Sequence, residues 1–399
     1  MITYLTSGES HGPGLTAIID GFPAGFSVNI DQINFQLERR QKGYGRGGRM
    51  KIEKDRVQIL SGIRNGYTMG GPITFHITNK DWKNWQKIMD PVNPISTDLT
   101  EREKRLAFDN TRPRPGHSDL PGGVKWNHHD LRNVLERASA RETAVRVALG
   151  ALVRQLLEYF GVEFASHVIR IGEVALPEGY DLSNLEKIRT ITEESEVRCL
   201  DKETGKKMIE AIKKAKKLKD SLGGIVEVIV RGLPIGLGSF SQWSDRLEGK
   251  LAGALMSVHS VKGVDIGMGF NSAQKYGSEV HDQIFYDKNG DLKKKMFYRK
   301  TNNAGGLEAG ITNGEDIIIH VAGKPISTLN QPLATVDIKT KKPAVAIVER
   351  TDCCVTPPLA VVCEAVSALV LTDAFLNKFG SDNFAEIERN YNSFLNTEF

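Results

Sequence analysis

The feature of this sequence that most constrains the fold is a long helical pattern between His128 and Gly161. Asp130 can cap its beginning, and Gly161 can end it. About 30 residues at a rise of 1.5 Å each make a rod of roughly 45 Å, long enough to run through the middle of a large domain. We therefore expect one continuous helix at the centre of the fold. Its apolar residues recur at three- and four-residue spacing: Leu131, Val134, Leu135, Ala138, Val145, Leu149, Leu152 and Leu156.

The rest of the chain mixes strand-like and helical patterns, with no clear linker and no low-complexity tract. With 399 residues the chain can bury a large core, so we expect residues 1–399 to form a single α+β domain or two intertwined α+β halves. Strands are expected at 2–5, 15–19, 57–60, 73–77, 225–230, 317–321 and 344–348. Helices are expected at 31–42, where Asp31 resembles an N-cap, and at 130–160, 204–218, 244–258 and 358–379. Asn289-Gly290 indicates a hairpin or loop within 282–299.

Composition narrows the functional classes. A net charge of +4 is small for this length and implies no extended field for nucleic acid. The four cysteines show no CxxC spacing, which favours reduced thiols, and the first residues lack the charged and apolar regions of a signal peptide. The apolar segment 357–379 contains Glu364 and Asp373, so we expect a buried helix and not a membrane span. A cytoplasmic protein that binds neither nucleic acid nor membrane is the expectation.

A stiff cationic loop lies between residues 109 and 119, with the sequence DNTRPRPGHSD. Two prolines fix the backbone around Arg112, Arg114 and His117. Two guanidiniums and an imidazole on a rigid loop suit an anionic ligand that also needs a proton moved. The alternative is a solvated loop with a histidine in a structural hydrogen bond.

Two glycine-rich loops have related chemistry. SGESHGPG follows the first strand and holds His11 at a strand end, although a histidine between glycines can also be a turn residue. In ERRQKGYGRGGRMKIE, Arg46 and Arg49 follow a helix at three-residue spacing and can converge on one polyanion. The alternative for the second loop is a solvated basic segment or an RGG-like element that binds nucleic acid.

The expected long helix also bears cations. On a continuous helix, Arg137 and Arg141 lie one turn apart on one face, with small Ala138 and Ser139 between them. The small residues would let the flat ring of a phosphorylated ligand approach the helix, and the arginines could bind its phosphate. The alternative is ordinary salt bridging, for example from Arg132 to Glu136.

These segments together carry a family resemblance. They occur in the order seen in chorismate synthases, and the chain resembles that family, in its shorter bacterial type, from Ser7 to Asp373. The motifs are SGESHG, RRQKGYGRGGRM, RPRPGHSDL, NVLERASARETA, SVHSVKGVDIGMGF, NNAGGLEAGITNGEDI and ERTDCCVTPP. The resemblance implies a β-α-β sandwich with long central helices, a homotetramer, and the 1,4-anti elimination of phosphate from 5-enolpyruvylshikimate 3-phosphate. It also implies reduced FMN as cofactor, without net redox change.

The resemblance assigns roles to residues. His11 would be the general acid at the departing phosphate, His117 would protonate the reduced flavin, and Asp352 would receive a proton from it. Substrate-binding positions are Ser10, Arg40, Arg46, Arg49, Arg112 and Arg141. Flavin-binding positions are Arg137, Ala138, Ser139, His259, Ser260, Ala309, Lys324, Pro325, Ile326, Ser327, Thr328 and Arg350.

Two positions depart from the family pattern, and two other functions remain open. His259 stands where the family usually has an amide, and Ala309 where it has glycine, which is tolerable if the φ of Ala309 is negative. NADPH is expected only as an indirect source of reduced flavin, through a separate flavin reductase. The alternatives are a flavin or nucleotide oxidoreductase, which the lack of a strand-linked GxGxxG disfavours, and a non-catalytic RNA-binding protein, which the near-balanced charge disfavours.

Overall fold

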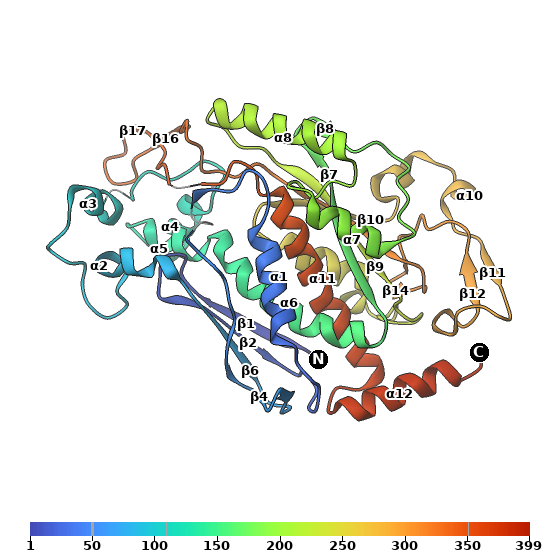
Figure 1. Ribbon diagram of the computed structural model, residues 1–399. Helices are drawn as coiled ribbons and strands as arrows, with labels where there is room; N and C mark the ends of the chain where they lie inside the picture. The colour runs from blue at the N-terminus through green and yellow to red at the C-terminus, as the bar shows by residue number, and fades with distance from the viewer. Residues whose placement is uncertain (49–51, 109, 350) are drawn as a thin grey trace.

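Two antiparallel sheets enclose a layer of helices in the computed structural model, which describes residues 1–48, 52–108, 110–349 and 351–399 (Figure 1). The first sheet has the order β1 (Thr3–Gly8), β2 (Gly14–Asp20), β6 (Ile73–Thr78) and β3 (Gln58–Ser61). The second has the order β10 (Val261–Ile266), β15 (Ile317–Gly323), β9 (Gly224–Arg231), β7 (Glu163–Ile171) and β8 (Val174–Ala175). The expected β-α-β sandwich is therefore confirmed.

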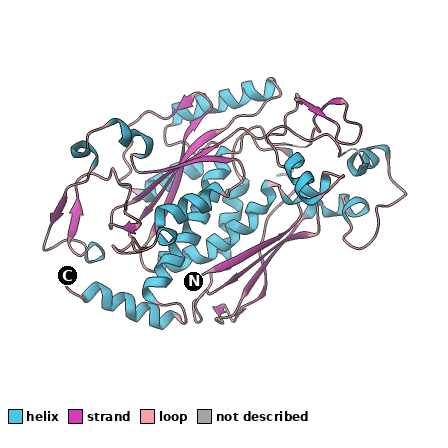
Figure 2. Ribbon diagram, turned by 180° about the vertical axis from the view of Figure 1, so that it is seen from behind, coloured by secondary structure: helices cyan, strands magenta, loops and turns pink. Residues whose placement is uncertain are grey.

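The helices between the sheets are α1 (Ile30–Gln41), α6 (Thr143–Tyr159) and α11 (Thr356–Phe379), as the view from behind shows (Figure 2). Gly150 of α6 lets α11 approach closely, since a Cβ at that position would lie 2.5 Å from the Cβ of Ala365. Within the described ranges, α11 is the one helix that is long and apolar enough to cross a membrane, and 89% of its most apolar window is buried. It is the buried core helix that the sequence predicts.

A buried ion-pair network ties the helix layer together. Glu364 of α11 is 1% exposed and accepts hydrogen bonds from Arg39 of α1 at 2.8 and 3.0 Å. It also accepts one from Arg154 of α6 at 2.7 Å and one from Ser166 of β7 at 2.5 Å. Burial acts to raise the pKa of Glu364, but the charges of Arg39 and Arg154 outweigh it and hold the pKa far below its usual value.

The prediction of one continuous central helix is wrong at Ser139. The segment divides into α5 (Arg132–Arg137), a 3₁₀ turn (Ala140–Glu142) and α6. Ser139 has an extended backbone with ψ of 140°, and its hydroxyl accepts a hydrogen bond from the backbone N–H of Arg141. A serine that caps the next turn interrupts the helix without disturbing the apolar periodicity. Long central helices are present nonetheless, in α6 and in the 24-residue α11.

The other expected elements are found with small shifts. The N-cap of α1 is Asn29 and not Asp31, and the last expected strand, at 344–348, is the shorter β17 (Pro343–Val345). Asn289-Gly290 lies in the loop between the antiparallel strands β11 (Ile284–Tyr286) and β12 (Phe297–Arg299). The remaining elements are α2 (Gln86–Met89), α3 (Glu101–Phe108), α4 (Asp119–Trp126), α7 (Leu185–Glu194), α8 (Lys202–Lys217), α9 (Leu247–Met256), α10 (Gly277–Val280), α12 (Phe384–Asn396), β4 (Ile63–Arg64), β5 (Tyr67–Thr68), β13 (Leu307–Glu308), β14 (Ile311–Thr312) and β16 (Ala334–Val336).

Candidate active site

A single large cavity collects loops from the whole length of the described chain. Its volume is about 560 Å³, which suits one or two small-molecule ligands. Leu135, Val258 and Leu359 contribute apolar wall, while most other lining groups are polar or charged. The expected site residues on its border are Ser10, His11, Arg40, Arg46, His117, Ala138, Ser139, Arg141, His259, Ser260, Lys324, Ile326, Ser327, Thr328 and Asp352.

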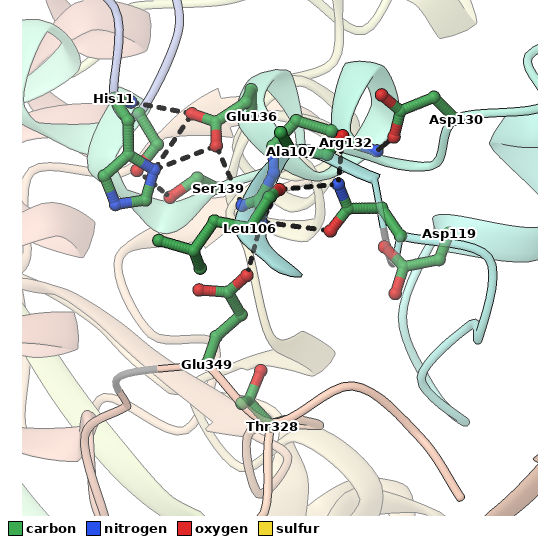
Figure 3. Close-up of polar contacts among 12 residues, drawn as sticks. His11, Leu106, Ala107, Asp119, Asp130, Arg132, Glu136, Ser139, Thr328 and Glu349 are labelled. Atoms are coloured by element: carbon green, nitrogen blue, oxygen red, sulfur yellow. Dashed lines mark hydrogen bonds and ion pairs between the residues drawn. The ribbon is translucent and has the colours of Figure 1, made fainter. Parts of the chain in front are cut away.

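His11 is held by a buried carboxylate from α5 (Figure 3). Its Nδ1 lies 2.9 Å from Oε1 of Glu136, and its backbone N–H donates to Oε2 at 2.7 Å. Arg132 donates to the same carboxylate at 3.2 Å. Burial acts to raise the pKa of Glu136, but the hydrogen bond and charge of His11, together with Arg132, outweigh it and keep the pKa below its usual value. His11 therefore faces an ionised carboxylate.

His117 has a similar arrangement on the proline-rich loop. Its Nδ1 lies 2.6 Å from Oδ1 of Asp119, which is 1% exposed. Arg114 donates to both oxygens of Asp119, at 2.8 and 3.0 Å, and its Nη1 donates to Thr328 at 2.8 Å. Burial acts to raise the pKa of Asp119, but the bonds from His117 and Arg114 hold it well below its usual value. Arg114 thus fixes this loop against the segment 324–328.

The guanidiniums of Arg40, Arg46 and Arg141 lie near one another on the border of the cavity. Arg141 pairs with both oxygens of Asp55 at 2.6 and 2.7 Å, while Arg40 lies 3.4 Å from the same carboxylate. Burial, helped by the charges of Arg141 and Arg46 and opposed by Asp55, lowers the pKa of Arg40 to about 9. In the part of the chain that the structure describes, Nη2 of Arg141 is buried without a hydrogen-bond acceptor. The nearest carboxylate to that nitrogen, Oε2 of buried Glu53, lies 3.7 Å away, an ion-pair distance too long for a hydrogen bond. The N–H of Nη2 is therefore a buried donor that an anion in the cavity could satisfy.

Asp352 lies beside this cationic group. Its Oδ2 is 2.9 Å from Nη1 of Arg46, and its Oδ1 accepts a hydrogen bond from the backbone N–H of Gly47. A Cβ on Gly47 would lie 2.6 Å from the carbonyl oxygen of Thr351, so this approach requires glycine. Asp352 is therefore an ion-pair partner of Arg46 as well as a group on the cavity border.

The segment expected to bind flavin contains strained and unsatisfied groups. Ser260 has φ of +75°, unusual for a residue with a side chain, and its carbonyl accepts a hydrogen bond from the backbone of Lys324 at 2.8 Å. Burial, opposed by the charge of Glu142, lowers the pKa of His259. Nδ1 of His259 and Oε2 of Glu142 are 3.9 Å apart, and neither has a hydrogen-bond partner among the described residues.

Some expected site residues do not reach this cavity. Arg112 and Pro325 are not on its border, and Arg137 donates to the carbonyl and hydroxyl oxygens of Thr6 instead. Because the helix breaks at Ser139, the expectation that Arg137 and Arg141 share a face is wrong. Arg49 and Arg350 lie outside the described residues.

Ala309 also lies away from the cavity of this chain, in the turn between β13 and β14. The condition under which alanine is easily tolerated there, a negative φ, is not met, because the φ of Ala309 is +50°. The following Gly310 also has a positive φ, of +95°, and a turn between two antiparallel strands favours such a pair. Ala309 therefore adopts the left-handed backbone that glycine would adopt with less strain.

Several groups that shape the site were not selected from the sequence. Asp55 neutralises two guanidiniums, while Glu136 and Asp119 each hold a histidine. Only Arg132 and Glu136 gave a local signal, through their four-residue spacing, and that spacing indicated a salt bridge. Asp55 lies far from Arg141 in sequence, so no local pattern reveals that pair. Asp119 is only two residues after His117, in the loop that the sequence did single out, but its role as the partner of His117 was not predicted.

The fold and the cavity together define an α+β protein with a composite, cation-lined site suited to a small polyanion and to proton transfer. The sequence matches the chorismate synthase family over residues 2–376. It is 54% identical over 394 residues to a chorismate synthase of Alkaliphilus metalliredigens, with 99% of each chain covered, and 49% identical over 387 residues to that of Bacillus subtilis, with 97% of each covered. A crystal structure of a chorismate synthase superposes with a TM-score of 0.78 at 38% identity, covering 99% of this chain and 97% of that one.

The chain belongs to the chorismate synthase family, whose enzymes are lyases of the shikimate pathway. The family resemblance and the α+β fold expected from the sequence are both confirmed.

Proposed function

We propose that this enzyme converts 5-enolpyruvylshikimate 3-phosphate into chorismate and phosphate by a 1,4-anti elimination, with reduced FMN in the same cavity and no net redox change. The observation that carries the proposal is the convergence of Arg40, Arg46 and Arg141 with two carboxylate-held histidines around one cavity. The substrate has two carboxylates and a phosphate, so its recognition requires cations. The elimination requires a group that can give up a proton near neutral pH.

Substrate binding is assigned to Ser10 and the guanidiniums on the cavity border. Arg46 is the strongest candidate for direct contact, because it borders the cavity and its partner Asp352 is 20% exposed, whereas Asp55, the partner of Arg141, is fully buried. Arg40 and Arg141 are buried and share the carboxylate of Asp55, and Arg141 also lies near Glu53. Their contribution to substrate binding is therefore the donor on Nη2 of Arg141, which has no hydrogen-bond acceptor among the described residues. Arg49 and Arg112 remain expectations from the family resemblance.

The residues on the flavin side fit the proposed cofactor. Nδ1 of His259 is an unsatisfied buried group that could bond to a flavin ring, and Lys324, Ser327 and Thr328 offer a cation and hydroxyls for a phosphate. Ala138 and Ser139 would contact the ring where the helix is interrupted. The chemistry that reduced FMN would supply, if bound beside these residues, is the transient transfer of an electron during the elimination. The roles of Arg137, Ala309, Pro325, Ile326 and Arg350 remain expectations from the family resemblance.

The proton steps are assigned to three side chains. His11 donates a proton to the departing phosphate, and His117 keeps the reduced cofactor in its required protonation state. Asp352 receives the proton that the elimination releases. The direct test is anaerobic incubation of the substrate with photoreduced FMN and enzyme. Chorismate absorbance should appear with reduced FMN and not with oxidised FMN, and its absence in both cases would refute the proposal.

Replacing Arg46 with alanine should weaken substrate binding about ten- to a hundredfold, because a hydrogen bond to a charged group contributes on the order of 1.5–3 kcal/mol. The substrate dissociation constant measured by calorimetry checks this result, and thermal unfolding shows that the variant is folded. Lys42→Ala is the matched control, since the side chain of Lys42 is half exposed and pairs with the exposed Glu38. An unchanged substrate dissociation constant in Arg46→Ala would show that Arg46 does not bind the substrate and would favour the alternative of a solvated basic loop.

We also propose that residues 1–399 act as one domain in a cytoplasmic homotetramer supplied with reduced flavin by a separate reductase. The purified enzyme should then be inactive in air with NADPH and FMN alone, because the sequence has no strand-linked dinucleotide motif. Adding a flavin reductase under anaerobic conditions should restore chorismate formation. Sustained turnover in air from NADPH and FMN without a reductase would show that the enzyme reduces flavin itself.

A further inference from the structure

The imidazole of His11 is fixed on several sides by buried groups. Nδ1 lies within 2.9 and 3.1 Å of the two carboxylate oxygens of Glu136, and the backbone N–H of His11 donates to the same carboxylate. The indole of Trp85 stacks on the ring with centroids 4.0 Å apart. Ser10, the preceding residue, donates its N–H to the carbonyl of Glu136 at 3.0 Å. Glu136 of α5 thus holds both the backbone of this loop and the imidazole ring.

Glu136 is itself held in place. Its side chain is 1% exposed and pairs with Arg132, four residues earlier on α5. Arg132 also donates to Asn110 at 3.0 Å, to the carbonyl of Leu106 at 3.1 Å and to Glu349 at 2.8 Å (Figure 3). Its guanidinium lies over the ring of Trp85, 5.2 Å from the centroid. Arg132 therefore contacts both Glu136 and Trp85, the two side chains that hold the ring of His11.

We propose that Glu136, held by Arg132, is a positioning residue that keeps the proton of the neutral His11 ring on Nδ1 and directs Nε2 toward the substrate. An ionised carboxylate can only accept a hydrogen bond, so Nδ1 must carry the hydrogen that it receives. Figure 3 shows the second ring nitrogen of His11 on the side away from Glu136. The inference rests on the proposed function only in giving His11 the role of general acid.

The carboxylate has an electrostatic effect as well as an orienting one. Its negative charge lies beside the ring of His11 and is shared with Arg132. A variant that removes the charge and keeps the shape therefore tests the electrostatic effect of Glu136. The other charged or titratable groups on the border of the same cavity are Arg40, Arg46, Arg114, Arg141, His117, His259, Lys324, Glu349 and Asp352.

The test is the variant Glu136→Gln, which keeps the shape and removes the charge. We expect kcat to fall at least about tenfold, with the substrate KM changed less than about twofold, since Glu136 does not border the cavity. The alkaline limb of the kcat profile should move to lower pH, because an amide stabilises an imidazolium less than a carboxylate does. Glu136→Asp, which keeps the charge on a shorter side chain, should lower kcat without moving that limb.

A second readout does not depend on turnover. In protein labelled with ¹⁵N-histidine, with His11 assigned from a His11→Asn sample, the neutral native ring should show the proton on Nδ1. In Glu136→Gln the Nε2-protonated tautomer should become populated. Glu210→Gln, on the exposed face of α8, is the control for loss of a carboxylate and should change neither readout.

The outcomes separate this inference from the proposed function. A folded Glu136→Gln variant with an unchanged pH profile and an unchanged His11 tautomer would overturn the positioning role. If Glu136→Gln does not fold, a native tautomer with the proton on Nε2 would overturn it equally. If His11→Ala retains full activity, the general-acid role fails, and the tautomer of His11 in Glu136→Gln still decides whether Glu136 positions the ring.

Discussion

Replacing His11 or His117 with alanine is expected to lower kcat by about 10²–10⁴-fold, the usual contribution of a general acid or base. Both rings border the cavity, and each is bound to a buried carboxylate that keeps its orientation. The loss should therefore appear in kcat measured with saturating substrate and photoreduced FMN under anaerobic conditions. Thermal unfolding should show that both variants remain folded.

The matched control is His281→Ala, because His281 is exposed and lies outside the cavity. That variant should retain the native rate. If kcat falls less than about tenfold in both His11→Ala and His117→Ala at the optimum pH, neither histidine acts as a general acid or base. A loss in His117→Ala alone would place the departing phosphate elsewhere than beside His11.

Replacing Glu364 with alanine is expected to destabilise the fold by about 3–5 kcal/mol, the usual cost of breaking a buried ion pair from one side. The change would leave the guanidiniums of Arg39 and Arg154 buried without their shared acceptor. Urea unfolding of the two proteins measures the difference. Glu194→Ala is the control, because Glu194 is exposed at the end of α7 and should leave stability unchanged.

The same network gives a pH dependence whose sign follows from Glu364. Because its folded pKa lies below its usual value, the carboxylate stabilises the fold at neutral pH, and the contribution is lost as the pH falls through the acid range. The stability difference between the native protein and Glu364→Ala should therefore narrow on acidification. A difference that stays small at neutral pH would show that the two arginines find other partners.

Much of the fold follows from local patterns. Apolar runs predict β2, β6, β9 and β15, whose buried positions are mostly apolar. The strand β7 was missed because Ser166, His167 and Arg170 interrupt its apolar pattern. Two of these polar residues contact distant partners: Ser166 donates to Glu364, and Nε2 of His167 lies 2.8 Å from Glu227. A local pattern cannot show that a polar residue will have a buried partner.

At the candidate site, local sequence patterns predict even less of the tertiary contacts. Proline and glycine loops predict where anion-binding groups gather, and the cavity brings together Arg46, His11 and His117 as expected. The helical periodicity gives no sign of the break at Ser139, which turns Arg141 toward Asp55 and leaves Arg137 with Thr6. Tertiary contacts decide whether an arginine faces a ligand or a buried carboxylate. Here the extended backbone of Ser139 alone separates Arg137 from Arg141.

We propose that the enzyme catalyses an elimination without net redox change. The most direct measurement follows chorismate, inorganic phosphate and reduced FMN together in one anaerobic reaction, with many substrate molecules for each flavin. We predict equal amounts of chorismate and phosphate, with the reduced flavin unchanged when the substrate is exhausted. Oxidation of one reduced flavin for each chorismate formed, or phosphate release without chorismate, would contradict the account.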